Sequence, residues 1–373
     1  MNLKFWKKQQ PKKPVSKGRE WFNAITFAVI AATLIRWTTV EAFVIPTPSM
    51  EDSALVGDFL FVSKFHYGTR TTSAPLQIPL THQTIWGTEI PSYLDWIELP
   101  SYRLPGISHV KQGDVVVFNV PDLKSNKGVR HPITLKSNYV KRCIALPGDR
   151  LEVRDRQVYV NGVAFPNPPG SKFSYIVVAT EQISEKNLQR LGLGSDDQYY
   201  GGDDSRGKAL YRMWLTADKV AELKQLNYIE SIELDQARSV LPEPDIFPTA
   251  RYGWNQNNYG PLTIPKKGMT IQVNDSTMDL YGSTISLYDH QKNVQVDKGH
   301  LIIDGKELTE YTFQQDYFFM MGDNRNNSED SRYWGFVPDD HVVGKALFVW
   351  MSIDQEGDFF NKVRWKRLFS RIQ

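Results

Sequence analysis

Hydrolytic chemistry needs a nucleophile, a base and a site for the developing oxyanion. The chain has no G-x-S-x-G elbow, and no cluster of histidine and aspartate indicates a catalytic triad. Two S-x-x-K matches exist, Ser108 with Lys111 and Ser205 with Lys208. The first leads into a predicted strand, the second lies in an acidic, glycine-rich stretch, and neither is followed by S-D-N or K-T-G. We interpret both matches as chance.

Metal and cofactor chemistry is not indicated. Cys143 is the only cysteine, so neither an internal disulfide nor a multi-thiolate metal site is available. The seven histidines lack ligand spacing such as H-E-x-x-H. The run GDNRNNSED has some features of a calcium loop, but Arg325 occupies a ligand position and the turn glycine is missing. We expect no metal and no cofactor, and a net charge of +2 without a basic, aromatic patch argues against nucleic acid as a partner.

Five dispersed blocks carry the remaining candidates for chemistry. Taken singly, each has a plain structural interpretation: Ser49 between two bulky neighbours could be a turn residue, and Lys141 could be one more solvated lysine. The blocks, in chain order, are IPTPSM (45–50), GDFLFVSKFHYG (57–68), KQGDVVVFNVP (111–121), YVKRCIALPGD (139–149) and MGDNRNNSEDSRYWGFVP (321–338).

Together and in this order, the blocks resemble the type I signal peptidase family, also called leader peptidase. The resemblance covers an N-terminal anchor and residues 43–68, 111–165 and 317–373, whereas the insertions at 68–110 and 170–310 match poorly. It implies a serine endopeptidase that cleaves signal peptides from exported preproteins at a membrane surface. In bacteria the family works on the extracytoplasmic side of the cytoplasmic (inner) membrane, facing the periplasm.

The resemblance assigns Ser49 as nucleophile and Lys141 as general base. A serine hydroxyl is a weak nucleophile until a neighbouring base takes its proton, and serine–lysine pairs are a known form of this arrangement. Lysine serves as a base only when it is neutral, so its pKa must fall from about 10.4 by roughly 2–3 units. Desolvation produces shifts of that size.

The last block supplies supporting residues by the same resemblance. Ser328 matches the serine that hydrogen-bonds the lysine amine. Asp330 and Arg332 match a buried acid–base pair, and Asp323 matches the acid that pairs with the arginine after the base, here Arg142.

Substrate contacts are implied by the first and fourth blocks. The hydroxyl of Thr47 matches the group that, with the backbone N–H of Ser49, forms the oxyanion hole. A peptide bound as an added strand is read by shallow pockets at positions −1 and −3, which take small residues such as those of Ala-x-Ala. The implied pocket walls are Phe43, Ile45, Met50, Tyr139 and Val140. Ala54 replaces a common leucine near this wall, and Asp52-Ser53 replace the usual Pro-Thr.

A membrane anchor is predicted for residues 21–40, WFNAITFAVIAATLIRWTTV, because a span needs roughly 20 largely apolar residues. A cleavable signal peptide or a buried core helix would read similarly. The flank, residues 1–20, is basic, which by the positive-inside rule puts the N-terminus in the cytoplasm. Its basic residues are Lys4, Lys7, Lys8, Lys12, Lys13, Lys17 and Arg19.

Beyond the anchor the sequence predicts a mainly β fold, an antiparallel β-sheet catalytic core with an inserted α+β subdomain. Short β-rich runs alternate with turns, and Asn161-Gly162 and Asp304-Gly305 predict tight hairpins. We place the core at 41–170, with a smaller insertion at 68–110, and at 311–373, with the subdomain at 171–310. The predicted strands are FLFVSKF, DVVVFNV, YVKRCIAL, RLEVRD, QVYVNGVAF, LIIDGKEL and YFFMMGD.

Inside the subdomain, residues 184–193 and 216–238 predict helices, and the run GSDDQYYGGDDSRGK between them predicts a mobile surface loop. In the smaller insertion, Tyr93, Trp96 and Tyr102 could cap the core or sit at a lipid interface, and we favour capping.

Two other functional interpretations stay open at this stage. One is a related serine–lysine processing protease, such as an organelle inner-membrane peptidase or a self-cleaving repressor-type domain. The other is an inactive, membrane-tethered binding domain, which loss of Ser49 or Lys141 would have indicated. Both residues are present.

Overall fold

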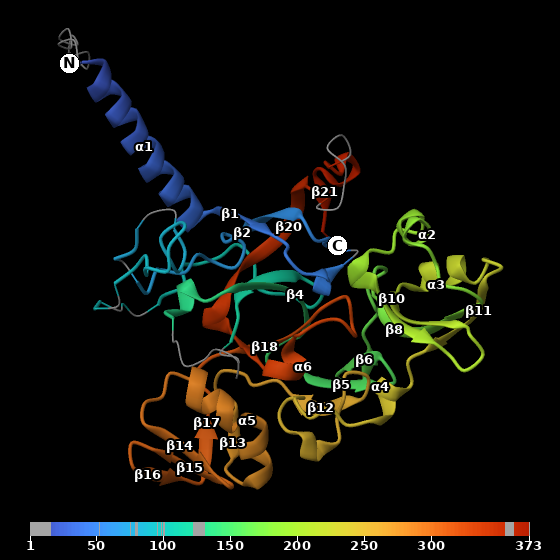
Figure 1. Ribbon diagram of the computed structural model, residues 1–373. Helices are drawn as coiled ribbons and strands as arrows, with labels where there is room; N and C mark the ends of the chain where they lie inside the picture. Colours follow the sequence, from blue (N-terminus) through green and yellow to red (C-terminus); the bar gives the residue numbers. More distant parts are fainter. Residues whose placement is uncertain are drawn as a thin grey trace, which may run out of the picture.

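Helix α1 (Lys17–Thr38) projects from one side of the body of the molecule (Figure 1). The computed structural model describes residues 16–51, 53–74, 76–78, 81–94, 96, 97, 99, 101–121, 131–354 and 362–372. The predicted basic N-terminus up to residue 15, and Asp52, lie outside the described residues.

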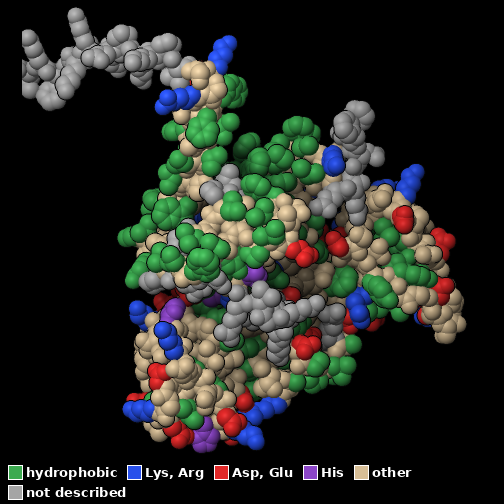
Figure 2. Space-filling view, turned by 60° about the vertical axis from the view of Figure 1, so that its left-hand side comes forward, with side chains coloured by type: hydrophobic (Ala, Val, Ile, Leu, Met, Phe, Trp, Pro, Cys, Tyr) green, Lys and Arg blue, Asp and Glu red, His purple; other side chains and the backbone are tan. Residues whose placement is uncertain are grey.

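Helix α1 has the length and composition of a membrane span, and none of its residues is buried (Figure 2). It is the one such helix in the described part of the chain. An apolar helix that packs on nothing in its own fold exposes hydrophobic surface along its whole length, which is favourable in lipid and unfavourable in water. The predicted anchor therefore fits the structure, with bounds shifted by a few residues toward the N-terminus.

The central sheet is antiparallel and joins strands from both ends of the chain. Alternating or continuous apolar runs form these strands because one or both of their faces are buried. The order is β1 (Val40–Val44), β2 (Asp58–Ser63), β20 (Val342–Ser352), β3 (Val115–Asn119), β4 (Asn138–Ala145), β18 (Tyr317–Met321) and β19 (Val337–Pro338), with β21 (Ser370–Arg371) beside β20. The predicted antiparallel, mainly β core is confirmed.

A second sheet continues from the first. Its order is β12 (Tyr259–Thr263), β5 (Arg150–Arg154), β6 (Gln157–Val160) and β7 (Val163–Ala164). The β6–β7 hairpin turns at Asn161 and Gly162, which both have positive φ, as a two-residue turn of this type requires. Asp304 and Gly305 have positive φ as well and join β15 (His300–Ile303) to β16 (Lys306–Leu308). Both predicted hairpins are confirmed.

Residues 173–234 form a separate four-stranded sheet with its own core (Figure 1). The helix predicted over 216–238 is too long: the observed helix ends at Leu223, and the strand that follows, Ile229–Leu234, pairs with β8. The predicted mobile loop is also wrong in part, since Gln198–Asp203 pairs with β10. Both segments gain backbone partners that local pattern does not reveal. The elements are β8 (Phe173–Ala179), α2 (Glu185–Arg190), β9 (Gln198–Asp203), β10 (Ala209–Leu215), α3 (Ala217–Leu223) and β11 (Ile229–Leu234), and the short helix α4 (Ala237–Val240) follows them.

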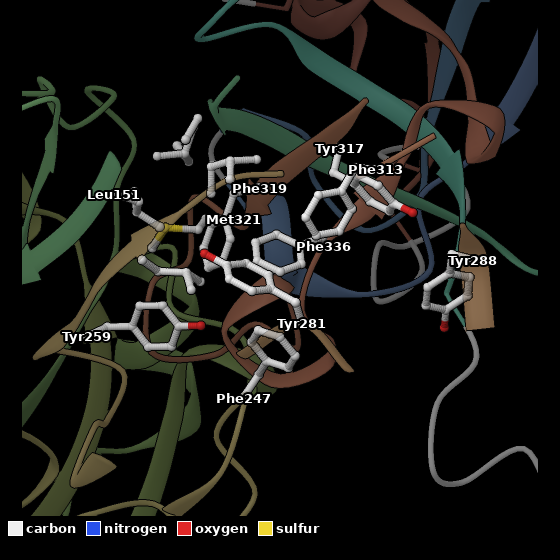
Figure 3. Packing of buried hydrophobic residues seen from close by; sticks show 14 of the residues in the cluster. Leu151, Phe247, Tyr259, Tyr281, Tyr288, Phe313, Tyr317, Phe319, Met321 and Phe336 are labelled. Atoms are coloured by element: carbon white, nitrogen blue, oxygen red, sulfur yellow. The ribbon is translucent and has the colours of Figure 1, made fainter. Parts of the chain in front are cut away.

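A second lobe, residues 270–312, packs under the central sheet through helix α5 (Asp275–Tyr288). Met278, Tyr281, Ile285 and Tyr288 are buried at helical spacing, and they meet aromatic side chains of β18 and its neighbours (Figure 3). No helix was predicted here. The remaining strands of the lobe are β13 (Thr270–Gln272), β14 (Val294–Asp297) and β17 (Glu310–Thr312).

The insertion at 68–110 runs along the base of α1 without regular strands in its described residues. The prediction that its three aromatic residues cap the core is wrong for Trp96 and Tyr102. Trp96 is 82% exposed and Tyr102 is 66% exposed, whereas Tyr93 is half-buried and contacts His131.

Candidate active site

Ser49 stands in a single turn of 3-10 helix, Pro48–Met50, shortly after the end of β1 at Val44. Two prolines, at 46 and 48, force extended conformations on the residues before them, so Thr47 is extended with φ −132° and ψ 153°. The backbone carbonyl of Ser49 accepts a hydrogen bond of 3.2 Å from the N–H of Asn324. The turn is thereby fixed both by its own sequence and by the loop after β18.

Lys141 lies in the middle of β4, on the same face of the strand as Tyr139. Its Nζ lies 2.6 Å from the Oγ of Ser49, and 5.4 Å from the centre of the Tyr139 ring. Because β4 is paired to β3 on one side, the position of Lys141 along the sheet is set by backbone register rather than by a flexible loop.

Burial controls the charge of Lys141. The residue is 3% exposed, and desolvation lowers the pKa of its amine to about 8. Three carboxylates, those of Asp330, Glu329 and Asp323, oppose the shift by favouring the ammonium form. Desolvation is the larger effect, so a substantial fraction of Lys141 is neutral and able to accept a proton slightly above neutral pH.

A cavity of about 570 Å³ opens beside this pair. The sequence-predicted candidates meet there: Ser49, Lys141 and Thr47 border it with all five predicted pocket residues, Phe43, Ile45, Met50, Tyr139 and Val140. Ala54 does not line it but is fully buried in a core cluster that also contains Met50.

Asp323 and Arg142 form a two-pronged ion pair, as predicted, with Nε–Oδ1 at 2.8 Å and Nη2–Oδ2 at 2.6 Å. Ser53 donates a further hydrogen bond to Asp323, and the Arg142 guanidinium reaches the carbonyl of Gly113. Arg142 follows the lysine on β4 and Asp323 follows β18, so this pair joins the two strands beside the site.

Asp330 and Arg332 form a second pair that is essentially inaccessible to solvent, with distances of 2.8 and 2.7 Å. The carboxylate also accepts from the N–H of Gly322, and the guanidinium donates to the carbonyls of Gln256 and Arg325. The pair is therefore also hydrogen-bonded to three backbone segments, at Gly322, Gln256 and Arg325.

The hydroxyls of Ser328 and Thr47 are the two remaining hydrogen-bonding groups that the sequence predicts at the site. The hydroxyl of Ser328 is buried and has no hydrogen-bond partner among the described residues, so the expected bond to the Lys141 amine is not formed in this structure. A side chain at Gly322 would collide with that hydroxyl and with the carbonyl of Ser49, so the three groups are close neighbours. The Thr47 hydroxyl lies 3.4 Å from Ser49 Oγ.

A buried charge cluster that the sequence did not predict lies behind the turn that carries Ser49. Lys172 forms ion pairs with Asp197 at 2.6 Å and with Glu51, two residues after Ser49, at 3.3 Å. The backbone of Lys172 also exchanges hydrogen bonds with Asp323 and Arg325. Lys172, directly before the subdomain at 173–234, thus contacts both the turn that carries Ser49 and the loop after β18, a link that no local motif signals.

Comparison with known proteins identifies the family to which this arrangement belongs. The family described as "Signal peptidase, peptidase S26" matches residues 18–206 and 262–351, most of the chain. The chain belongs to the signal peptidase family. It is therefore a peptidase, and the resemblance seen in the five sequence blocks is confirmed at the level of the family.

Individual relatives extend over nearly the whole chain. A signal peptidase I of Buchnera aphidicola (subspecies Acyrthosiphon pisum) is 27% identical over 344 residues, which cover 91% of this chain and 78% of that protein. Another from Haemophilus influenzae is 24% identical over 376 residues, covering 96% and 77%. A third, from Helicobacter pylori, is 24% identical and covers 92% and 90%.

The pKa of Lys141 predicts the pH dependence of this signal peptidase family member. With Lys141 as the general base that we propose below, the amine is mostly protonated below about pH 8 and cannot take a proton, so kcat/KM should rise through pH 8 and level off above it. Initial rates on a preprotein, measured from pH 5 to 10, check this. A maximum near pH 5 would indicate a carboxylate base and contradict the expectation.

The buried Asp330–Arg332 ion pair should contribute to the thermal stability of the protein. Asp330→Asn leaves a buried guanidinium without its counter-charge, which costs about 3–5 kcal/mol, so the melting temperature should fall by several degrees. Glu152→Gln removes the acid of a surface pair with Arg154 and serves as the matched control, with little change expected. Equal melting temperatures for the two variants would refute a structural role for the buried pair.

Proposed function

We propose that this peptidase acts as signal peptidase I, cleaving N-terminal signal peptides from exported preproteins with Ser49 as nucleophile and Lys141 as general base. The observation that carries the proposal is the 2.6 Å contact between Ser49 Oγ and a buried amine whose pKa is lowered to about 8. A lysine that served structure alone would be expected to form an ion pair, whereas in the described contacts the amine faces a hydroxyl at the edge of a cavity.

In the proposed reaction, neutral Lys141 takes the Ser49 proton as Oγ attacks the scissile carbonyl carbon. The ammonium group then protonates the leaving amine as the C–N bond breaks, which leaves an ester between Ser49 and the signal peptide. Water, deprotonated by Lys141, attacks that ester and restores the serine. One lysine can serve both steps because its pKa lies close to the working pH.

The oxyanion of each tetrahedral intermediate needs donors that are already in place. We assign this role to the Thr47 hydroxyl and the backbone N–H of Ser49. Thr47 lines the cavity, its hydroxyl lies 3.4 Å from Ser49 Oγ, and its extended backbone is held by the following Pro48.

Substrate binding as an added strand has structural support. Strand β1 is at the end of the central sheet, paired only with β2 in the described part of the chain. Strand β18 pairs with β4 only from Arg142 onward. On that side of β4, residues 138–141 therefore have no pairing with β18, and they lie beside the cavity. An extended peptide could therefore meet backbone groups there while its alternate side chains enter the cavity. Apolar walls close to Ser49 favour small residues at −1 and −3.

Placement at the membrane follows from the short connection between α1 and the nucleophile. The helix ends at Thr38, and Ser49 follows after one strand and one turn. We place α1 across the bacterial cytoplasmic membrane with the N-terminus inside and the catalytic body on the periplasmic side, as the basic flank indicates. A signal peptide that lies in the same membrane would deliver its cleavage site to this surface.

Alanine substitutions test the Ser–Lys assignment. Ser49→Ala and Lys141→Ala should each abolish preprotein cleavage while the melting temperature stays close to that of the wild type. Lys141→Arg should be inactive as well, because a guanidinium stays protonated. Ser108→Ala and Lys111→Ala, from an S-x-x-K match outside the cavity, are the controls and should retain activity. Appreciable turnover by either variant of the pair would end the assignment.

Substitutions at Thr47 test the oxyanion role. Thr47→Val keeps shape and β-branching but deletes the donor, so kcat should fall by about 10²–10³ with little change in KM. Thr47→Ser restores a hydroxyl and should recover most of the activity. Steady-state kinetics and melting temperatures of both variants decide the question. If Thr47 only braces the turn, Thr47→Val should keep a near-wild-type kcat or lose stability together with activity.

A further inference from the structure

A second cavity, of about 350 Å³, lies between the end of α1 and the insertion at 68–110. Its size falls in the range of roughly 300–1,000 Å³ that is typical of small-molecule sites. The last turns of α1 form one wall through Thr33, Leu34, Arg36 and Trp37. Of the residues that line the active-site cavity, it shares Asn138 alone, so it is a distinct site.

The charged residues that line this cavity are mostly cations. Arg36 and Lys64 share a single carboxylate, that of Glu41, at 2.5 and 2.8 Å. The Arg70 guanidinium donates to neutral oxygens, those of the Asn119 side chain and the Asp340 backbone. Three cations therefore face one lining carboxylate.

The acids behind Arg70 have other partners. The Asp340 carboxylate contacts the His341 ring at 2.7 Å, and that of Asp339 pairs with Arg103 at 3.2 Å. Within the cavity, Lys64 is largely buried, and desolvation lowers the pKa of its amine in spite of the pair with Glu41. An additional anion in the cavity would offset that desolvation.

The surroundings of the cavity are apolar and exposed. Hydrophobic side chains cover α1 and continue onto the part of the body at its base (Figure 2). In the insertion, Trp86 and Trp96 are 70% and 82% exposed. Soluble proteins rarely expose so much contiguous apolar surface, and tryptophan is enriched where proteins meet lipid headgroups. Other exposed hydrophobic residues of this stretch are Leu76, Ile78, Ile90, Leu94, Ile97, Leu99, Tyr102, Leu104 and Ile107.

We propose that this cavity binds the phosphate headgroup of an anionic phospholipid, with Arg36 and Lys64 as the contacting cations and the acyl chains lying along α1 and the insertion. A lipid is favoured over a protein partner because a helix of membrane-spanning length forms one wall of the cavity. The proposal rests on α1 lying in a membrane and is independent of the roles assigned to Ser49 and Lys141.

Headgroup selectivity is the first test. The full-length protein is released from nanodiscs of equal parts phosphatidylglycerol and phosphatidylcholine, and the lipids it retains are counted by native mass spectrometry. Both lipids carry the phosphate, but the trimethylammonium group of phosphatidylcholine would place a further positive charge beside Arg36, Lys64 and Arg70. We therefore expect one phosphatidylglycerol retained about ten-fold more often than phosphatidylcholine. Equal retention of the two lipids would overturn the proposal, and this measurement needs no variant.

Two variants and one control locate the site. Arg36→Gln and Lys64→Met should each reduce the retained phosphatidylglycerol about ten-fold, whereas Lys306→Gln, an exposed lysine in the distant lobe, should not. Unchanged retention in both cavity variants, or equal loss in the control, would refute the site. The melting temperatures of all three variants should stay close to that of the wild type, which shows that they fold.

A soluble phosphate is the competing source of the same chemistry. Detergent-solubilised protein is therefore incubated with glycerol 3-phosphate before native mass spectrometry. The lipid proposal expects no retained adduct, because the acyl chains supply part of the affinity. An adduct that depends on Arg36 and Lys64 would instead identify a site for free phosphate compounds and overturn the assignment to lipid.

Discussion

The burial of one amine against one hydroxyl is the constraint on which the rest of the site depends. Lys141 is nearly inaccessible to solvent and 2.6 Å from Ser49 Oγ, and the desolvation that lowers its pKa to about 8 also makes its charged form costly. A buried amine without a carboxylate in contact is unfavourable for folding, so the surrounding structure has to enforce it. Register within β4 and the proline-braced turn at 46–48 provide that enforcement.

Two buried ion pairs limit how strongly the neighbouring carboxylates stabilise the charged form of Lys141. Asp323 and Asp330 are both completely buried beside the site, and each is bound by two nitrogens of an arginine. If either arginine were lost, the freed carboxylate would favour the ammonium form of Lys141 more strongly. The pairs therefore have an electrostatic as well as a structural consequence, because they fix where negative charge lies relative to the amine.

Insertions in this fold are connected to the site rather than appended to it. The sheet at 173–234 follows Lys172, which forms one ion pair with Glu51, behind the turn that carries Ser49, and another with Asp197. The lobe at 270–312 packs its helix under β18, the strand that leads to the supporting loop. The insertion at 68–110 lies at the base of α1, where it exposes aromatic residues instead of capping the core.

The sequence by itself determined the family, the mainly β core, both tight hairpins, the apolar helix and the residues that meet around the cavity. These follow from local signals: strand patterns, Asn-Gly and Asp-Gly turns, a long apolar run, and five blocks in family order. It did not determine α5, whose Ser, Thr and Gly content hides a buried face that the packing against β18 creates, or strands β9 and β11, which exist because β10 and β8 pair with them. The Lys172 cluster, the unpartnered hydroxyl of Ser328 and the cation-lined cavity at α1 likewise arise from contacts between distant residues. Tertiary structure decided these features because desolvation, ion pairing and strand exchange depend on which segments lie side by side, and that information is not contained in any local stretch of the chain.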